Sequence, residues 1–196
     1  MAPVAQIEFA SLFLPYRSVV SHQIGSCQVS NGLLYVSVGD GHQIQKSQQV
    51  GTPLGKVLRM ALDDKPVSTN PFYREEIPQD EIPASARNYI WAMGFRNPFG
   101  LKLAGDRMFV ADNGGRIDRF LEIRKGGNYL WDGTGSSIGL NAKAVLVPGR
   151  GVGQLEFHPQ NQNCSHLDFW MLSSSRSPGM FESEKGFQTS LLCLTT

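Results

Sequence analysis

Short apolar runs separated by turn residues make up most of this chain, and a continuous helical repeat of apolar residues is hard to find. Runs of about 4–8 residues bounded by Gly, Pro, Asn or Asp are typical of β-strands. The expected strands are Leu33–Val38, Val57–Leu62, Tyr89–Met93, Met108–Ala111, Gln154–Phe157 and Phe169–Leu172. With 21 glycines, 11 prolines and 18% charged residues among 196, the composition favours an all-β fold rich in turns over a helical bundle.

A weak internal repeat indicates that these strands form similar sheets. The segment Gly32–Gly41 resembles Gly105–Gly114, because each has a glycine, an apolar–aromatic–Val–small core and a polar turn that ends in glycine. A poorer third copy surrounds Trp170, so the aromatic position recurs after roughly 60–75 residues. Repeating units of several strands, each with a Gly-rich turn, favour radially arranged sheets such as those of a β-propeller.

Charge and cysteine content exclude several classes of protein. The formal net charge is +1, so the chain lacks the basic footprint of a nucleic-acid-binding protein and a polybasic membrane patch. No apolar run approaches the roughly 18 residues of a membrane span. The three cysteines are far apart and form no C-x-x-C pair, which argues against a zinc ribbon or a disulfide framework. Residues 1–14 have no basic stretch before their apolar run, so we expect no signal peptide and assign no compartment.

Composition also divides the chain into two parts. Residues 1–160 carry the strand pattern and are the expected folded domain. Residues 161–196 contain the linker-like cluster Ser173–Pro178 and no usable period, so they are expected to form an irregular tail. Within the first part, Asp63–Ala86 is rich in Pro, Asp and Glu and is predicted to be a long surface loop.

Two short motifs imitate catalytic sites but lack the context that those sites require. Gly51–Val57 resembles a phosphate-binding loop, yet it is one residue short and has Val where the magnesium-binding hydroxyl belongs. Gly135–Gly139 matches the G-x-S-x-G pattern around Ser136, but no helical run follows it. Both are interpreted as loops. Asn163–Ser165 is a formal glycosylation sequon that matters only in an exported chain.

Four other clusters each allow a structural and a functional interpretation. His22 is either a surface loop residue or a general base, a role that suits an imidazole near neutral pH. Arg96 and Asn97 form either a turn or a rigid pair of donors for one anionic or carbonyl oxygen. Asp112–Gly115 is a hairpin turn or a source of carbonyl ligands for a hard cation. Lys125–Trp131 is another turn followed by aromatic packing.

The order and spacing of these clusters closely resemble the glucose/sorbosone dehydrogenase family, the soluble quinoprotein sugar dehydrogenases that use pyrroloquinoline quinone. The resemblance covers roughly residues 20–160. The same fold occurs in hedgehog-interacting-protein-like proteins. The matching motifs are His22-x-x-Gly25, Gly32-x-Leu-Tyr35-Val-x-x-Gly39-Asp40, Gly55-Lys56-Val-Leu58-Arg59-Met-x-Leu-Asp63, Asn70-Pro71-Phe72, Gly94-x-Arg96-Asn97-Pro98-x-Gly100, Ala111-Asp-Asn-Gly114 and Lys125-Gly-Gly-Asn128-Tyr129-x-Trp131.

The resemblance implies a six-bladed β-propeller and an oxidoreductase of aldose-type sugars. It implies that His22 is the catalytic base, which takes the proton of a sugar hydroxyl while a hydride passes to the quinone. It further implies calcium as a Lewis acid at the quinone carbonyl, and a separate electron acceptor as a partner. The implied cofactor-binding residues are Arg96, Asn97 and Asn113, and the implied metal ligands are the backbone carbonyls of Gly114 and Gly115.

The chain also departs from the family pattern. Leu130 stands where the family usually has glycine, the turn at Asp112–Gly115 differs, and no match follows Pro159 for the family's later basic residues. The length supplies about three of six blades, so we expect an incomplete propeller, a fragment whose open edges are covered by the remaining blades or by a second copy. The alternative function is a non-catalytic propeller module that binds a protein or carbohydrate partner.

Overall fold

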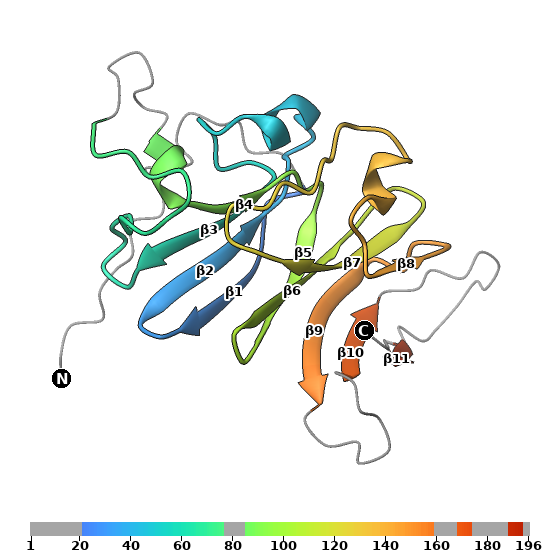
Figure 1. Ribbon diagram of the computed structural model, residues 1–196. Coiled ribbons are helices and arrows are strands. Elements are labelled where there is room, and N and C mark those ends of the chain that lie inside the picture. Colours follow the sequence, from blue (N-terminus) through green and yellow to red (C-terminus); the bar gives the residue numbers. More distant parts are fainter. Residues whose placement is uncertain (1–20, 77–84, 159–167, 174–187, 194–196) are drawn as a thin grey trace.

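The computed structural model describes residues 21–76, 85–158, 168–173 and 188–193. Over these residues the protein is all-β, as the sequence predicted, and its strands form three antiparallel sheets (Figure 1). The helices of this part of the chain are short 3-10 segments: η1 (Ile44–Gln48), η3 (Ser85–Tyr89) and η4 (Ser137–Gly139). None of its helices is long and apolar enough to cross a bilayer.

Consecutive strands pair in each sheet, so the topology is that of three successive meanders. The first sheet contains β1 (Ile24–Ser30), β2 (Leu33–Val38), β3 (Lys56–Ala61) and β4 (Ile90–Met93). The second contains β5 (Pro98–Ala104), β6 (Arg107–Asp112), β7 (Asp118–Ile123) and β8 (Ala144–Leu146). The third contains β9 (Val152–His158), β10 (Asp168–Ser173) and β11 (Gln188–Cys193).

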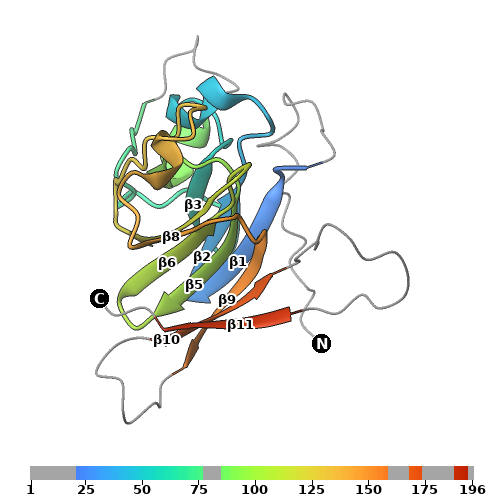
Figure 2. The same cartoon turned by 90° about the vertical axis from the view of Figure 1, so that its right-hand side faces the viewer.

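The sheets are arranged radially, because β1 contacts β5 and β5 contacts β9. The first strands of the three sheets therefore lie next to one another, as the view in Figure 2 shows. This is the arrangement of propeller blades, and it confirms the expected incomplete β-propeller. The sequence repeat marks the second strand of each blade, β2, β6 and β10, and the turn before β2 contains Gly32 in the left-handed region at φ 72°.

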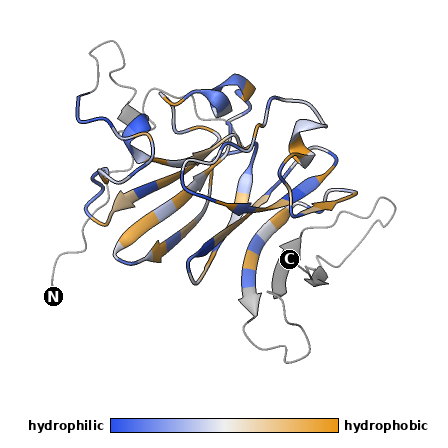
Figure 3. Ribbon diagram, viewed as in Figure 1, coloured by the Kyte–Doolittle hydropathy of each residue, from blue (hydrophilic) through white to orange (hydrophobic). Residues whose placement is uncertain are grey.

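The hydrophobic core lies between neighbouring blades and also on the face of the first sheet that points away from the second sheet. Alternation of side chains along a strand sends neighbours to opposite faces. Val57 packs against the second sheet near Leu101 and Val110, whereas Leu58 faces a separate cluster with Val36. A third cluster of buried residues joins the second and third sheets. Figure 3 shows that hydrophobic and hydrophilic residues alternate along several of the strands.

Some sequence expectations hold and others do not. The described parts of the predicted loop Asp63–Ala86 are residues 63–76, which form no strand beyond a single bridge at Pro66, and residues 85–86, which begin η3. Five strands, β1, β5, β7, β8 and β11, were not predicted. β1 mixes exposed and half-buried small residues, β5 contains Pro98 and Gly100, and β7 begins with two charged residues that the fold buries. The strands β10 and β11 belong to the segment 161–196, while the proposed boundary after residue 160 stays a prediction.

Lys56, the first residue of β3, is a fully buried cation. Its Nζ donates hydrogen bonds to the carbonyl oxygens of Lys46, Ser47 and Leu54 at 2.7–2.9 Å. These bonds attach the loop between β2 and β3 to the sheet. Burial lowers the pKa of Lys56 from 10.5 to about 7.

Stability is therefore expected to rise with pH above neutrality. Below pH 7 both the folded and the unfolded chain hold the Lys56 proton, but between pH 7 and about 10.5 only the unfolded chain keeps it. The free energy of unfolding then increases by up to about 1.4 kcal/mol per pH unit. Urea unfolding at pH 7, 8 and 9 measures this slope. Lys56→Met should abolish it and the exposed control Lys125→Met should not; equal slopes in wild type and Lys56→Met would contradict the assignment.

Candidate functional site

The predicted site residues lie on loops at one end of the blades. His22 precedes β1 and Asp40 follows β2; Arg96 precedes β5 and Asn113 follows β6. Trp131 belongs to the loop after β7. In an antiparallel pair the start of one strand and the end of the next lie at the same edge, and the adjacent β1 and β5 bring the two blades' loops together.

His22 forms a buried pair with Asp40. The His22 Nδ1 atom lies 2.6 Å from Asp40 Oδ1, and the two residues are 8% and 1% exposed. Burial alone would raise the pKa of Asp40, but hydrogen bonds from His22 and Trp131 outweigh it and lower that pKa below its ordinary value. An ionised carboxylate only accepts hydrogen bonds, so Nδ1 carries a proton, and whenever the imidazole is in its neutral form Nε2 has the free lone pair.

The backbone around this pair is constrained. His22 and His42 both have φ of 58°, in the left-handed region that residues other than glycine rarely adopt. Their rings stack with centroids 3.9 Å apart, and the His42 backbone N–H also donates to Asp40. Such conformations persist where the surrounding contacts enforce them, and they concentrate at functional sites. The imidazole of His22 is thus held between a carboxylate and a second ring.

Arg96 and Asn97 form a fixed turn whose backbone N–H groups both donate to Asp112. One N–H of the Arg96 guanidinium donates to the carbonyl oxygen of Asn113 at 2.7 Å. The guanidinium carbon lies over the Trp131 ring, 5.9 Å from the ring centroid. The side-chain amide of Asn97 has no hydrogen-bond partner among the described residues. This turn therefore presents several donors that the described protein atoms do not use.

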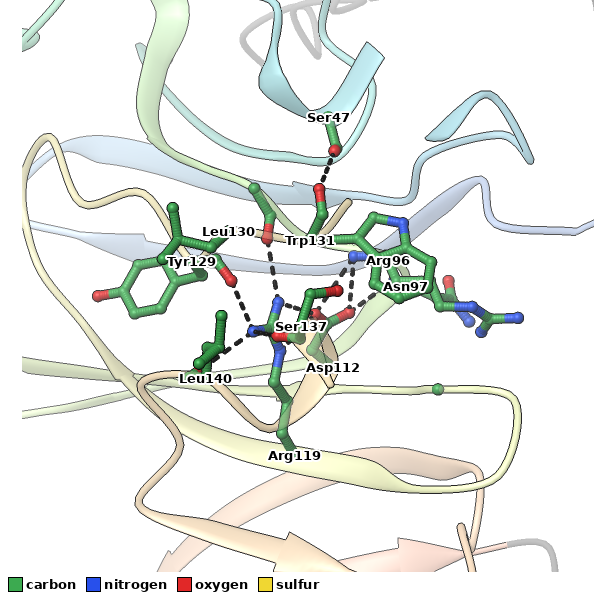
Figure 4. A network of polar contacts seen from close by, with 12 residues as sticks. Ser47, Arg96, Asn97, Asp112, Arg119, Tyr129, Leu130, Trp131, Ser137 and Leu140 are labelled. Atoms are coloured by element: carbon green, nitrogen blue, oxygen red, sulfur yellow. Dashed lines mark hydrogen bonds and ion pairs between the residues drawn. The ribbon is translucent and has the colours of Figure 1, made fainter. Parts of the chain in front are cut away.

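Arg119 holds these loops together from below (Figure 4). It is buried and forms an ion pair with Asp112 at 2.8 Å. Its guanidinium also donates to carbonyl oxygens in three separate segments, those of Gly94, Tyr129, Ser137 and Leu140. Burial raises the pKa of Asp112, although the charge of Arg119 opposes that effect. The roles of Arg119 and Asp40 were not predicted, because no sequence motif indicates which strand ends and loop carbonyls the fold brings against them.

Asn113 lies in the cluster, but its side chain faces the third blade. The amide donates to the Val152 carbonyl at 2.9 Å and accepts from the Val152 N–H at 3.0 Å. Both ends of the amide are therefore engaged in linking the loop after β6 to β9. Its assignment as a cofactor ligand stays a prediction, and binding a ligand through this amide would require it to exchange those bonds.

The oxygen atoms around Gly114 and Gly115 are too few to form a calcium site by themselves. Calcium takes six to eight oxygen ligands, and the turn offers two backbone carbonyls. The nearest carboxylate, Asp118, is buried and already accepts from three backbone N–H groups, those of Gly114, Arg150 and Gly151. No cluster of three or more His, Cys, Asp or Glu residues suited to a metal occurs in the described ranges. We therefore assign no chemical step to calcium.

A carbonyl-rich anionic quinone fits the remaining groups better. The unused N–H groups of Arg96 and the free amide of Asn97 are charged and neutral donors of the kind that carboxylate and quinone oxygens accept. Nε2 of His22 has no partner in the described part of the chain. The N–H of Asp40, which binds His22, donates to the Arg96 carbonyl at 2.7 Å, so the buried base and the half-buried Arg96–Asn97 pair lie on adjoining loops.

The two misleading motifs are loops, as interpreted. Gly51–Val57 leads into β3 and not from a strand into a helix, and its Lys56 is the buried residue described above. Ser136 precedes the three-residue segment η4, so it does not occupy a strand-to-helix elbow. The sequon Asn163–Ser165 lies outside the described residues.

Comparison with known proteins defines the class of this fold and site. The sequence profile of the Glucose / Sorbosone dehydrogenase family matches residues 13–150. The chain belongs to this family, which confirms the resemblance in the sequence motifs.

Two curated relatives are similar over 60% of the chain. The aldose sugar dehydrogenase YliI of Escherichia coli is 28% identical over 120 residues, and the HIPL2 protein of Arabidopsis thaliana is 31% identical over 143 residues. The matched regions cover 30% and 19% of those proteins, so the chain spans less than a third of either relative's length.

The fold is also similar to solved structures of the family. The PQQ-bound aldose sugar dehydrogenase from Streptomyces coelicolor superimposes with a TM-score of 0.53 at 24% identity. The alignment covers 72% of this chain and 39% of that one. The apo-form of the soluble aldose sugar dehydrogenase from Escherichia coli gives a TM-score of 0.58 at 19% identity, over 81% of this chain and 51% of that one. Both support the β-propeller fold, and the chain matches about half or less of either structure's length.

Proposed function

We propose that this chain contributes the base and the quinone-oxygen contacts of a sugar dehydrogenase that uses pyrroloquinoline quinone. The observation that carries the proposal is the buried His22–Asp40 pair, which is joined to Arg96 by a backbone hydrogen bond from the Asp40 N–H to the Arg96 carbonyl at 2.7 Å. Family membership supports an oxidoreductase of sugars, and the relatives named as aldose sugar dehydrogenases support an aldose as the substrate class.

His22 accepts the hydroxyl proton of the sugar. When bound, pyrroloquinoline quinone supplies a two-electron acceptor for the hydride on the same sugar carbon. Loss of one proton from oxygen and one hydride from carbon converts the C–OH group into a carbonyl, so the charges balance. Nε2 of His22 receives the proton because Asp40 fixes the Nδ1–H tautomer, and the ionised Asp40 then stabilises the imidazolium.

Arg96 and Asn97 bind and orient oxygens of the quinone. Their backbone is fixed by Asp112, so their donors need little reorganisation when negative charge develops on a bound oxygen. Asn113 acts here by holding the loop on which the Arg96 guanidinium rests. A separate electron acceptor must reoxidise the cofactor, since the reaction removes two electrons in each turnover.

The direct test supplies the purified chain with the quinone, with and without calcium, and follows reduction of a redox dye by glucose and other aldoses. Quinone binding is measured separately by equilibrium dialysis. His22→Gln is expected to retain quinone binding and to lower kcat by about 10²–10⁴-fold, the usual contribution of a positioned base.

The matched control is Ser136→Ala, an exposed hydroxyl in the misleading G-x-S-x-G motif. It should leave both quinone binding and dye reduction unchanged. Absence of quinone binding would overturn the proposal and favour a non-catalytic module that binds a protein or carbohydrate. Turnover that is equal in wild type and His22→Gln would overturn the role of His22.

A further inference from the structure

Trp131 is held rigidly beside the His22–Asp40 pair. Its indole is 7% exposed. Its backbone N–H donates to Gly94 at 3.0 Å, and its carbonyl accepts from Ser47 Oγ at 2.9 Å and from Gln48 Nε2 at 3.1 Å. These bonds connect the loop after β7 to η1 and to the turn before β5. The position of the ring is therefore set by three segments that are distant in sequence.

The indole of Trp131 contacts both the His22–Asp40 pair and the Arg96 guanidinium. Its Nε1–H donates to Asp40 Oδ2 at 2.9 Å, across 91 positions of sequence and in a buried environment. The other oxygen of that carboxylate, Oδ1, accepts from His22. The opposite contact is with the Arg96 guanidinium, which lies 5.9 Å from the ring centre. Trp131 thus contacts both the carboxylate that binds His22 and the Arg96 guanidinium, beside a direct backbone hydrogen bond from Asp40 to the Arg96 carbonyl.

We propose that Trp131 is a positioning residue for His22, acting through Asp40. Its Nε1–H is the only described donor to Asp40 Oδ2, so it fixes the rotation of the carboxylate and thereby the direction from which Oδ1 meets Nδ1. Without this N–H, a buried carboxylate oxygen loses its partner, and the carboxylate gains freedom to turn. The inference rests on the proposed role of His22, but it concerns an arrangement that exists without cofactor.

The chain contains a matched control for this N–H group. Trp91, in β4, also has its Nε1 buried, but that atom has no hydrogen-bond partner among the described residues. Its ring contacts Tyr35 edge-on and lies under the Arg59 guanidinium at 4.3 Å. A Trp→Phe change at either position removes an indole N–H and some ring area, yet only the change at Trp131 removes a hydrogen bond.

The test compares Trp131→Phe with Trp91→Phe by ¹⁵N NMR of the histidine side chains, recorded at an alkaline pH above the range in which the histidine signals of each variant titrate. The His22 signal is assigned from the spectrum of His22→Gln. Wild type and Trp91→Phe should show the Nδ1–H tautomer. Trp131→Phe should increase the minor Nε2–H tautomer of His22 by about tenfold, as expected for loss of one charge-assisted hydrogen bond. The pKa of Asp40, followed by ¹³C NMR, should rise in the same variant, because the Trp131 hydrogen bond lowers it.

An unchanged His22 tautomer and an unchanged Asp40 titration in folded Trp131→Phe would overturn the inference and leave Trp131 a packing residue. If that variant does not fold, Asp40→Asn provides the second measurement. It should shift the indole N–H resonance of Trp131 upfield and leave that of Trp91 in place; no shift at Trp131 would overturn the inference. Because these readouts need no quinone, they remain valid even if quinone binding fails and the proposed function is wrong.

Discussion

Arg119→Met should destabilise the protein by about 3–5 kcal/mol, the cost of leaving a buried charge without its partner. Arg119 and Asp112 are both fully buried, and all the N–H groups of the guanidinium find acceptors. Methionine fills much of the same space but offers no donor, so Asp112 and the carbonyls around it lose their partner. A domain is typically stable by only 5–15 kcal/mol, and urea unfolding would measure the loss.

Two further variants separate charge from packing. Arg107→Met removes a half-exposed arginine from its pair with Glu122, and Lys143 stays beside that carboxylate, so this change should cost less than Arg119→Met. Combining Arg119→Met with Asp112→Asn removes the unpaired charge, so the double variant should be more stable than the sum of the single effects predicts. Equal losses for Arg119→Met and Arg107→Met would show that the buried pair does not hold the loops together.

The strands that could be predicted from the sequence are those that carry a run or alternation of apolar residues. β7 is buried as fully as β3, but the charged residues Asp118, Arg119 and Glu122 interrupt its apolar run, so it was missed. β3 is buried along almost its whole length, and β2 and β6 carry the two copies of the repeat, so their apolar runs are long enough to detect. β1 and β5 lie side by side as first strands of their blades. Small residues, Pro98 and exposed positions interrupt their patterns, so hydrophobic periodicity does not detect them.

The repeat contained a functional signal that the sequence analysis did not use. Both copies have an aspartate at the end of the second strand, Asp40 after β2 and Asp112 at the end of β6. Each aspartate accepts hydrogen bonds from the segment that enters the first strand of its own blade. Asp40 binds His22, which precedes β1, and Asp112 binds the backbone of Arg96, which precedes β5.

An aspartate at the end of the second strand thus positions the proposed base in one blade and the proposed quinone-binding donors in the next. His22 and Arg96 could be predicted as site residues because their residue types and spacing match a family motif. A motif match does not predict which contacts hold these residues in place. That depends on contacts such as Trp131 with Asp40 and Arg119 with four carbonyls, in which backbone atoms and distant segments take part.

Gly39→Ala should displace His22 although it leaves the imidazole in the protein. A Cβ atom at position 39 would lie 2.5 Å from the His22 carbonyl oxygen and 2.7 Å from its Cα. These are backbone atoms that cannot rotate away, and Gly39 is itself held by hydrogen bonds to Gln23 and Gly55. We expect a loss of about 1–3 kcal/mol in the free energy of unfolding, as for overpacked sites, and loss of the His22–Asp40 contact.

The measurement combines urea unfolding with the NMR signal of the His22 Nδ1–H. The control is Gly135→Ala, because a Cβ there meets no atom within 4 Å and the residue has ordinary φ. Gly39→Ala should abolish the Nδ1–H signal and lower kcat as strongly as His22→Gln, whereas Gly135→Ala should match wild type. If Gly39→Ala keeps both the signal and the wild-type stability, the backbone around His22 is free to move. The proposed pre-positioning of the base by its buried surroundings would then be wrong.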